Sequence, residues 1–245
     1  MPLLNGLLYP WRAFHLIRQH RELWGFVLVP ILLNVVVGIL LYTWLYMVGL
    51  NQIEQFGVNG SNLAAILTTL AKVVYLIGLA IGVGWLMVRF GVVLGAPWYG
   101  QLAGRLEVIV SGQAEAETPL SVARVAHDIG RALLFELKKL ALTLAIGLPG
   151  LLLNFVPLLG NTLSTAIAIC LGALIACLDF FDAPLERQHM RFRAKLGMVR
   201  QTFPASSSFG FLAAFLVSIP LLNLVTIPLC VAGGTLLVIE QQNRD

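Results

Sequence analysis

Two arginines stand directly before the first long apolar segment, and their chemistry suits an anion. Arg18 and Arg21 precede the charge-free run that begins at Leu23. If that run is a helix, its first turn has unpaired N–H groups and the positive end of the helix dipole, which attract anions. Guanidinium groups add paired hydrogen bonds to a tetrahedral oxyanion. Arg18 and Arg21 are therefore candidate oxyanion ligands. The alternative is that they only hold this end of the chain on one side of a membrane.

Three asparagines follow prolines at a similar spacing inside apolar segments. The elements are Pro30-Ile31-Leu32-Leu33-Asn34, Pro157-Leu158-Leu159-Gly160-Asn161 and Pro220-Leu221-Leu222-Asn223. Proline-interrupted apolar segments in matching positions of a chain can mark a transport site. Asn34, Asn161 and Asn223 are therefore candidate substrate ligands. The alternative is that Pro-Leu-Leu recurs by chance in a leucine-rich chain, which is the simpler explanation for the copy at Pro30.

The composition indicates the solvent in which these residues must work. Of the 245 residues, 58% are hydrophobic and 11% are charged, and the mean hydropathy is +0.87. A soluble domain has about 25% charged residues and avoids large exposed apolar patches. A disordered chain needs low hydrophobicity and high net charge. Both classes are excluded, and we expect a single-domain, all-α integral membrane protein whose main partner is the lipid bilayer.

Runs without charge predict where the chain enters the membrane. Residues 23–53 form one run, which is longer than the roughly 20 residues that a transmembrane helix needs. Residues 63–95 form a second run, interrupted by Lys72 and Arg89, which either snorkel to the two interfaces or face an anion path. We therefore expect two long transmembrane helices, joined by a polar turn at 51–62 and preceded by an amphipathic segment at 1–22.

The middle of the chain is expected to lie in the cytoplasm. Ala96-Pro97 should bend the chain, because proline disfavours helix at the residue before it. The polar segment 98–139 then predicts two cytoplasmic helices, at about 98–112 and 119–139. Glycine pairs spaced as Gly-x-x-x-Gly predict a face for close helix packing in lipid. These pairs are Gly78/Gly82, Gly91/Gly95 and Gly100/Gly104.

Two longer charge-free windows follow, at 140–178 and 201–239. Each is close to twice the length of a span, so each must turn, and each has a Pro-Leu-Leu element near its middle. A turn in water would be expected to carry charge or several polar residues, whereas these carry one asparagine each. We therefore expect two re-entrant helical hairpins whose tips stay in or near the membrane. The alternative is that each window forms two ordinary spans joined by a tight turn.

The basic residues set the expected orientation. Lysine and arginine concentrate in 1–22, 98–139 and 179–200, while the loop at 51–62 has neither. The positive-inside rule then places both termini in the cytoplasm. The net charge of +4 is modest and is attributed to these inner loops, so no nucleic-acid partner is expected. Asp179 and Asp182 are expected to cap a helix or to pair with the arginines that follow them.

Motifs for nucleotide, metal or covalent chemistry are missing from the sequence. It contains no G-x-x-x-x-G-K-[ST] loop and no H-E-x-x-H pair. Ser206-Ser207-Ser208 has no nearby histidine and no nucleophile elbow. We therefore expect a protein that is not an enzyme, has no ATPase activity of its own, and uses no metal and no cofactor.

Several motifs in the second half of the chain have a recognisable order. They are Ala96-Pro97-Trp98-Tyr99-Gly100, Asp179-Phe180-Phe181-Asp182-Ala183-Pro184, Phe209-Gly210 and Ile219-Pro220-Leu221-Leu222-Asn223. With Pro30 and Asn34, they resemble the CysZ sulfate permeases and the wider etoposide-induced-protein family over nearly the whole chain. The resemblance implies an inner-membrane protein with two long transmembrane helices and two partly penetrating hairpins. It also implies assembly into homo-oligomers and sulfate uptake for cysteine biosynthesis.

One departure from that family concerns the anion site. Its sulfate permeases usually have Pro-Gly and paired basic residues before the first span, where the resemblance implies sulfate binding. This chain has Glu22-Leu23-Trp24-Gly25-Phe26 there, so Arg18 and Arg21, about one turn earlier, are the candidates to replace the pair. The sequence hypothesis is a bacterial inner-membrane permease for sulfate or a similar oxyanion. The alternative is a non-transporting membrane scaffold or assembly protein.

Overall fold

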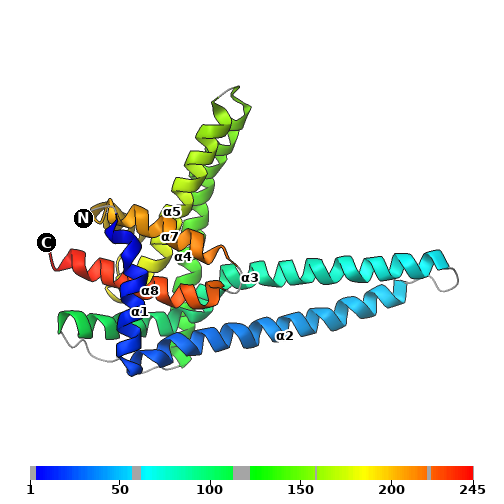
Figure 1. Cartoon of the computed structure of the whole chain (residues 1–245), viewed down its shortest axis with the longest axis horizontal. Helices are drawn as coiled ribbons and strands as arrows, with labels where there is room; N and C mark the ends of the chain where they lie inside the picture. Colours follow the sequence, from blue (N-terminus) through cyan, green and yellow to red (C-terminus); the bar gives the residue numbers. More distant parts are fainter. Residues whose placement is uncertain (1–3, 57–61, 113–121, 158, 220–221, 245) are drawn as a thin grey trace.

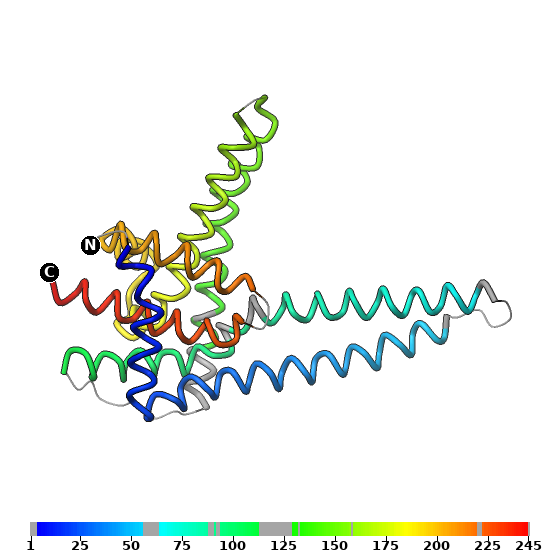
Figure 2. The backbone as a smooth tube through the Cα atoms, in the orientation of Figure 1, coloured from blue at the N-terminus to red at the C-terminus, as the bar shows by residue number. Residues whose placement is uncertain are grey.

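The computed structural model describes residues 4–56, 62–112, 122–157, 159–219 and 222–244. Over these residues the chain is helical and has no strand, which confirms the all-α fold class. Its α-helices are α1 (Asn5–Gln19), α2 (Trp24–Phe56), α3 (Asn62–Ser111), α4 (Val122–Leu152), α5 (Gly160–Arg187), α6 (Phe192–Gln201), α7 (Ala205–Val217) and α8 (Leu222–Gln242). Short 3-10 helices, η1 (Arg21–Leu23) and η2 (Leu153–Phe155), precede α2 and follow α4. Figures 1 and 2 show a helical bundle from which two hairpins project, α2–α3 and α4–α5.

Among the described residues, four helical segments are long and apolar enough to cross a membrane. They are Arg21–Gln55, Ala64–Met87, Gly160–Arg187 and Leu222–Gln242. In the first two, only 17% and 11% of the most apolar window is buried inside the protein, so most of that apolar surface requires lipid around it. The chain is therefore a multi-pass membrane protein.

Polar contacts near its far end hold the α2–α3 arm together. Lys72 Nζ donates a hydrogen bond of 2.7 Å to Glu54 Oε1 on α2, and Tyr75 Oη donates to the backbone carbonyl of Leu45. Lys72 thus has a carboxylate partner, while the side chain of Arg89 lies outside the described residues. Residues 51–56 of the expected polar turn are instead the last turns of α2, and 57–61 lie outside the described residues.

Two expected helix boundaries are wrong. Pro97 does not end the helix, because α3 continues through it to Ser111. Tyr99, Leu102 and Leu106 beyond it are at most 3% exposed, and their packing compensates for the hydrogen bond that proline removes. The boundary expected at residue 139 is also absent, since α4 runs unbroken from Val122 to Leu152. The two expected cytoplasmic helices are thus the ends of longer helices.

Only part of the expected glycine face packs against a neighbour. A Cβ at Gly91 would lie 3.0 Å from Asn34 Oδ1, and a Cβ at Gly104 would overlap the guanidinium of Arg187. Three others, Gly78, Gly82 and Gly100, have open space where a Cβ would be. Gly78 and Gly82 line an apolar groove between α2 and α3, so in this part of α3 the small residues leave a gap rather than a contact.

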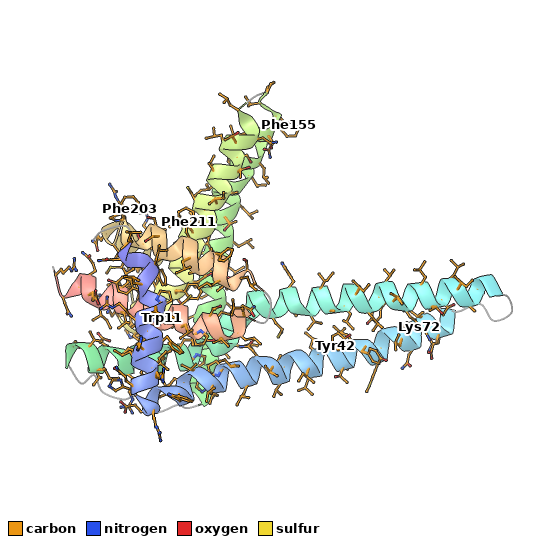
Figure 3. The ribbon with its side chains drawn as sticks, viewed as in Figure 1. Trp11, Tyr42, Lys72, Phe155, Phe203 and Phe211 are labelled. Carbon is orange, nitrogen blue, oxygen red and sulfur yellow. The ribbon has the colours of Figure 1, made fainter. Side chains whose placement is uncertain are left out.

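Both late charge-free windows contain a turn between two helices. In the first, η2 and a turn containing Pro157 join α4 to α5, and Phe155 at the tip is 84% exposed (Figure 3). In the second, α7 and α8 lie in the bundle, and 78% of the apolar window of α8 is buried. Its expected turn residues, Pro220 and Leu221, lie outside the described residues. In Figure 1 the α7–α8 turn ends well short of the far end of the α2–α3 arm, and α4–α5 projects obliquely to that arm.

Close packing of α5, α7 and α8 forms the centre of the bundle. The fully buried rings of Phe181 and Phe209 stack with their centroids 5.8 Å apart. At Gly210 the approach is so close that a Cβ would lie 2.3 Å from the carbonyl oxygen of Ala173. At Gly234 a Cβ would lie 2.5 Å from the carbonyl oxygen of Phe180, so no larger residue fits at either position without movement of the backbone.

The amino-terminal helix is a structural part of this bundle. Tyr9 Oη donates a hydrogen bond of 2.7 Å to Glu240 Oε2 at the end of α8, and Arg12 forms an ion pair with the other oxygen of Glu240. Burial and this hydrogen bond raise the pKa of Tyr9 to about 12. Trp11 lies on the opposite, exposed face of α1 (Figure 3), which gives the helix the amphipathic character expected for 1–22.

Candidate anion site

A cavity of about 560 Å³ lies between α4, α5 and α7. Three charged residues, Glu136, Lys139 and Asp179, contribute to its lining. The rest of the wall is small, hydroxyl-bearing or apolar: Thr143, Gly147, Gly150, Leu151, Ser164, Ile167, Ala168, Leu171, Gly172, Ile175, Ala176, Phe180, Ala213, Ala214, Val217 and Ser218. Along α4 the lining runs from Glu136 to Leu151, about 22 Å at 1.5 Å per residue. We call this cavity the α4–α5–α7 groove.

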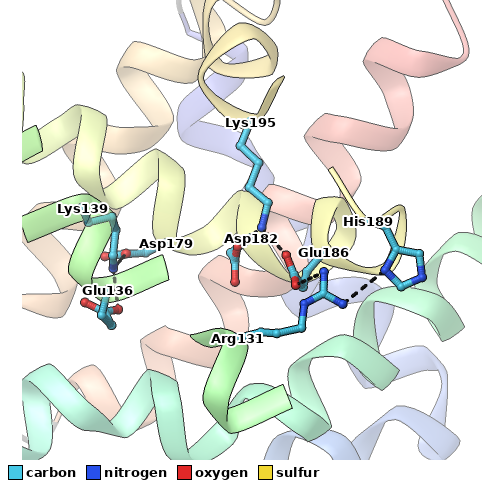
Figure 4. Close-up of polar contacts among 8 residues, drawn as sticks. All are labelled: Arg131, Glu136, Lys139, Asp179, Asp182, Glu186, His189 and Lys195. Atoms are coloured by element: carbon cyan, nitrogen blue, oxygen red, sulfur yellow. Dashed lines mark hydrogen bonds and ion pairs between the residues drawn. The ribbon is translucent and has the colours of Figure 1, made fainter. Parts of the chain in front are cut away.

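A buried lysine lies at the charged end of the groove. The Lys139 side chain is 7% exposed, and its ammonium donates to Glu136 Oε1 at 2.6 Å and to a carboxylate oxygen of Asp179 (Figure 4). An unpaired buried ammonium is strongly destabilising. The two carboxylates therefore make it possible for the charged Lys139 side chain to be buried. We call Lys139, Glu136 and Asp179 the first lysine triad.

A second triad of the same composition lies beside it. The Lys195 side chain is 3% exposed and pairs with Asp182 and with Glu186 Oε2 at 2.5 Å. Both ammonium groups lie near the ring of Phe135, that of Lys139 5.2 Å and that of Lys195 4.7 Å from its centroid. Lys195, Asp182 and Glu186 form the second lysine triad, and none of them lines the groove.

The acidic pair at the end of α5 therefore has partners other than those expected from the sequence. Asp179 and Asp182 bind lysines of α4 and α6, and not the arginines that follow them, so that prediction is wrong. Arg131 joins the network: its Nη2 pairs with Glu186, and its Nη1 lies 3.2 Å from His189 Nδ1 (Figure 4). The network links the base of the α4–α5 hairpin to α6.

A signal for the first triad was present in the sequence and was missed. Lys139 and Asp179 are the charged residues on either side of the window 140–178. When a window folds into a hairpin at its middle, the residues that bound it meet at the base. Opposite charges in those two positions therefore predict a pair across the hairpin.

The structure does not bring the five predicted ligands together. Arg18 and Arg21 are exposed at the junction of α1 and α2, whereas Asn161 is exposed at the start of α5, at the tip of the α4–α5 hairpin (Figure 1). Asn34 and Asn223 are each 5% exposed. None of the five lines the α4–α5–α7 groove.

Asn34 has a structural contact that the sequence did not indicate. Its Nδ2 donates to the carbonyl oxygens of Pro30, at 2.9 Å, and of Gly91 on α3, at 3.3 Å. Among the described residues its buried Oδ1 has no hydrogen-bond partner. Asn34 therefore ties α2 to α3 through the backbone carbonyl of Gly91.

The groove has the chemistry to hold an anion. It offers an ammonium from Lys139 and hydroxyl groups from Thr143, Ser164 and Ser218 along otherwise apolar walls. An ammonium and hydroxyls can donate to an oxyanion, while the small residues leave room beside it. Within the described ranges no group of three His, Cys, Asp or Glu side chains is arranged to hold a metal ion.

Comparison with known proteins relates this architecture to a family. The family model described as "Sulfate transporter CysZ/Etoposide-induced protein 2.4" matches residues 9–228. The chain belongs to this family. The match includes α2, α3, both late hairpin turns and the whole lining of the groove.

Curated members of the family match the chain over most of its length. The protein named "Sulfate transporter CysZ" of Pseudomonas aeruginosa is 27% identical over 244 residues, which cover 100% of this chain and 98% of the relative. The protein of the same name from Pectobacterium atrosepticum is 26% identical over 94% of this chain and 82% of its own length. That of Salmonella typhimurium is 25% identical over 88% of this chain and 84% of its own. The family resemblance therefore extends over nearly the entire fold.

Proposed function

We propose that the chain is an inner-membrane permease that carries sulfate into bacterial cells for cysteine biosynthesis and does not hydrolyse ATP. The observation that carries the proposal is the similarity, over nearly the full length, to transporters named for sulfate. A groove with an ammonium and hydroxyl donors supports an oxyanion as the substrate.

The route that we propose runs along the α4–α5–α7 groove. Its lining extends about 22 Å along α4, in a direction oblique to the α2–α3 arm (Figure 1). Arg18 and Arg21, which are exposed at the junction of α1 and α2, collect the anion at the inner surface in this proposal. Asn161 and Asn223 are proposed as contacts near the hairpin turns, and Asn34 as a contact between the spans.

In the proposed topology both termini are cytoplasmic and both late hairpins are re-entrant. The short reach of the α7–α8 turn and the oblique direction of α4–α5 relative to the α2–α3 arm support tips that do not cross the bilayer (Figure 2). The lipid-exposed apolar surface of the α2–α3 arm leaves room for a second copy of the chain, and we propose a homo-oligomer.

The direct test is uptake of labelled sulfate into proteoliposomes containing the purified chain, with selenate and phosphate as competitors. A permease gives saturable uptake, and selenate, which has the shape and charge of sulfate, competes better than phosphate. A membrane scaffold of the same family gives no flux of any anion above that of empty liposomes, and that result overturns the proposal.

The proposed role of the two arginines has its own test. Arg18→Ala with Arg21→Ala is expected to lower uptake at low sulfate several-fold without loss of folding, since both side chains are exposed. Because the effect is electrostatic, the difference from the native chain should shrink at high ionic strength. Unchanged uptake at low salt would remove these residues from the mechanism.

A further inference from the structure

The first lysine triad differs from the second in one respect that matters for an anion. Both contain a buried ammonium and two carboxylates, yet only the first faces the α4–α5–α7 groove. Within it, the side chains of Glu136 and Asp179 are 33% and 23% exposed, whereas that of Lys139 is 7% exposed. The ammonium is thus less accessible than the two carboxylates that pair with it.

The formal charge of this triad opposes binding as it stands. One lysine and two carboxylates sum to a net negative charge, so an oxyanion that approaches Lys139 is repelled by the residues that neutralise it. The Lys139 ammonium can bind the anion only when one of the two carboxylates moves away from it. Glu136 lies three residues before Lys139 on the same helix and stays beside it, whereas Asp179 reaches it from α5 across the hairpin.

We propose that Lys139 is the anion-binding residue of the groove and that Asp179 is its resident counter-ion, which an oxyanion displaces. Thr143, one turn further along the same face of α4, supplies a hydroxyl donor to the anion once it is bound. While the anion occupies the place of Asp179, the ion pair between Lys139 on α4 and Asp179 on α5 is broken. A bound anion and an intact ion pair at the base of the hairpin therefore exclude each other. This inference rests on the proposed function, because it assumes that the groove carries an oxyanion.

The test uses sulfate uptake by the full chain in proteoliposomes, with KM and maximal rate measured for each variant. Asp179→Asn removes the competing charge and should lower the KM for sulfate several-fold. Lys139→Gln combined with Asp179→Asn removes the cation without leaving an unpaired carboxylate on α5, and uptake at low sulfate should fall by about tenfold or more. A native KM in this double variant overturns the assignment of Lys139.

The second triad supplies the matched control. Lys195→Gln combined with Asp182→Asn deletes the same kind of pair near the same phenylalanine ring, and should keep the native KM because this triad does not line the groove. A rise in KM equal to that of the Lys139 double variant would show a structural effect of losing any such pair, and would overturn the proposal.

Thermal unfolding in detergent separates this inference from the proposed function. Sulfate should raise the unfolding midpoint of the native chain and of the Lys195 double variant, and should leave that of the Lys139 double variant unchanged. If the native chain gives no flux but shows this Lys139-dependent shift, permease function fails and the binding site stands. If the native chain transports sulfate and the shift persists without Lys139, the binding site fails and the permease function stands.

Discussion

The two hairpins late in the chain come from windows of similar composition and have different environments. In α5 only 39% of the most apolar window is buried, whereas in α8 the figure is 78%. The absence of charge in a segment thus indicates that water does not surround it. It does not tell whether lipid or protein does. The glycines differ as well: a Cβ at Gly210 or Gly234 would overlap the backbone of α5, whereas a Cβ at Gly172, which lines the α4–α5–α7 groove, would meet nothing within 4 Å.

The largest difference between the hairpins is expected in cysteine labelling. In a chain whose three native cysteines are replaced, Asn161→Cys at the exposed tip of α4–α5 should react with a lipid-soluble maleimide, and Asn223→Cys, 5% exposed in the native chain, should not. Gly160 is unsuitable for this purpose, because a Cβ there would lie 1.9 Å from the carbonyl oxygen of Leu153.

The same variants test the proposed topology when the reagent is charged and is added only outside spheroplasts. Asn161→Cys should then stay unlabelled, while Gln52→Cys, exposed near the far end of α2, should react. Ready labelling at both positions would mean that the α4–α5 hairpin crosses the bilayer.

The next largest effect is expected from one methyl group at a close contact. Gly210→Ala should lower the free energy of unfolding by about 1–3 kcal/mol, because the new Cβ would lie 2.3 Å from the Ala173 carbonyl oxygen and the helices must separate. Urea or thermal unfolding in detergent micelles measures the change.

Gly172→Ala is the matched control for that substitution. Its Cβ enters open space, and alanine stabilises a helix by roughly 0.5–1 kcal/mol relative to glycine, so stability should rise slightly. Equal losses from both substitutions would contradict the contrast between the two hairpins.

A smaller difference is expected between Asn161 and Asn223, which occupy similar positions after a proline in the sequence. Asn223→Ala should cost about 1 kcal/mol of unfolding free energy, because its side chain is buried, whereas exposed Asn161→Ala should change stability by less than about 0.5 kcal/mol. Sulfate uptake is measured on the same samples. A fall in uptake for Asn161→Ala at native stability would support the prediction that it contacts substrate, and native uptake would remove it from the route.

The smallest effect is expected at the tip itself. Phe155 is 84% exposed, so Phe155→Ala removes almost no packing within the chain and should alter the unfolding free energy in detergent by less than about 0.5 kcal/mol. A loss comparable to that of Gly210→Ala would mean that the tip packs against a second copy of the chain.

The sequence predicted most of the fold because charge is costly in lipid and its absence can be read directly. Charge-free runs gave the apolar core of α2, the outer part of α3 and the turns in both late windows. The continuation of α3 through Pro97 could not be predicted, because it depends on the burial of Tyr99, Leu102 and Leu106 against elements far away in the chain. Tertiary packing outweighed the local tendency of a helix to end before proline.

Less of the candidate site could be predicted. Reasoning from helix entrances led to Arg18 and Arg21, which are exposed, while the buried cation that lines the groove is Lys139. In the sequence, Lys139 differs from its neighbour Lys138 only in standing directly before the charge-free window 140–178, opposite Asp179 at the other end. That the pair lines a cavity depends on how α4, α5 and α7 pack, which no local pattern predicts.

The unbroken course of α3 has a mechanical consequence. A helix of 50 residues is about 75 Å long and joins the lipid-exposed arm, on one side of Pro97, to Tyr99, Leu102 and Leu106 on the other. If the arm tilts, these three side chains must shift against the bundle unless α3 itself bends. Bending costs least at Pro97, because a proline already interrupts the hydrogen bonds of the helix. Changes in bilayer thickness or tension that act on the arm are thereby transmitted to the bundle or absorbed at that single residue.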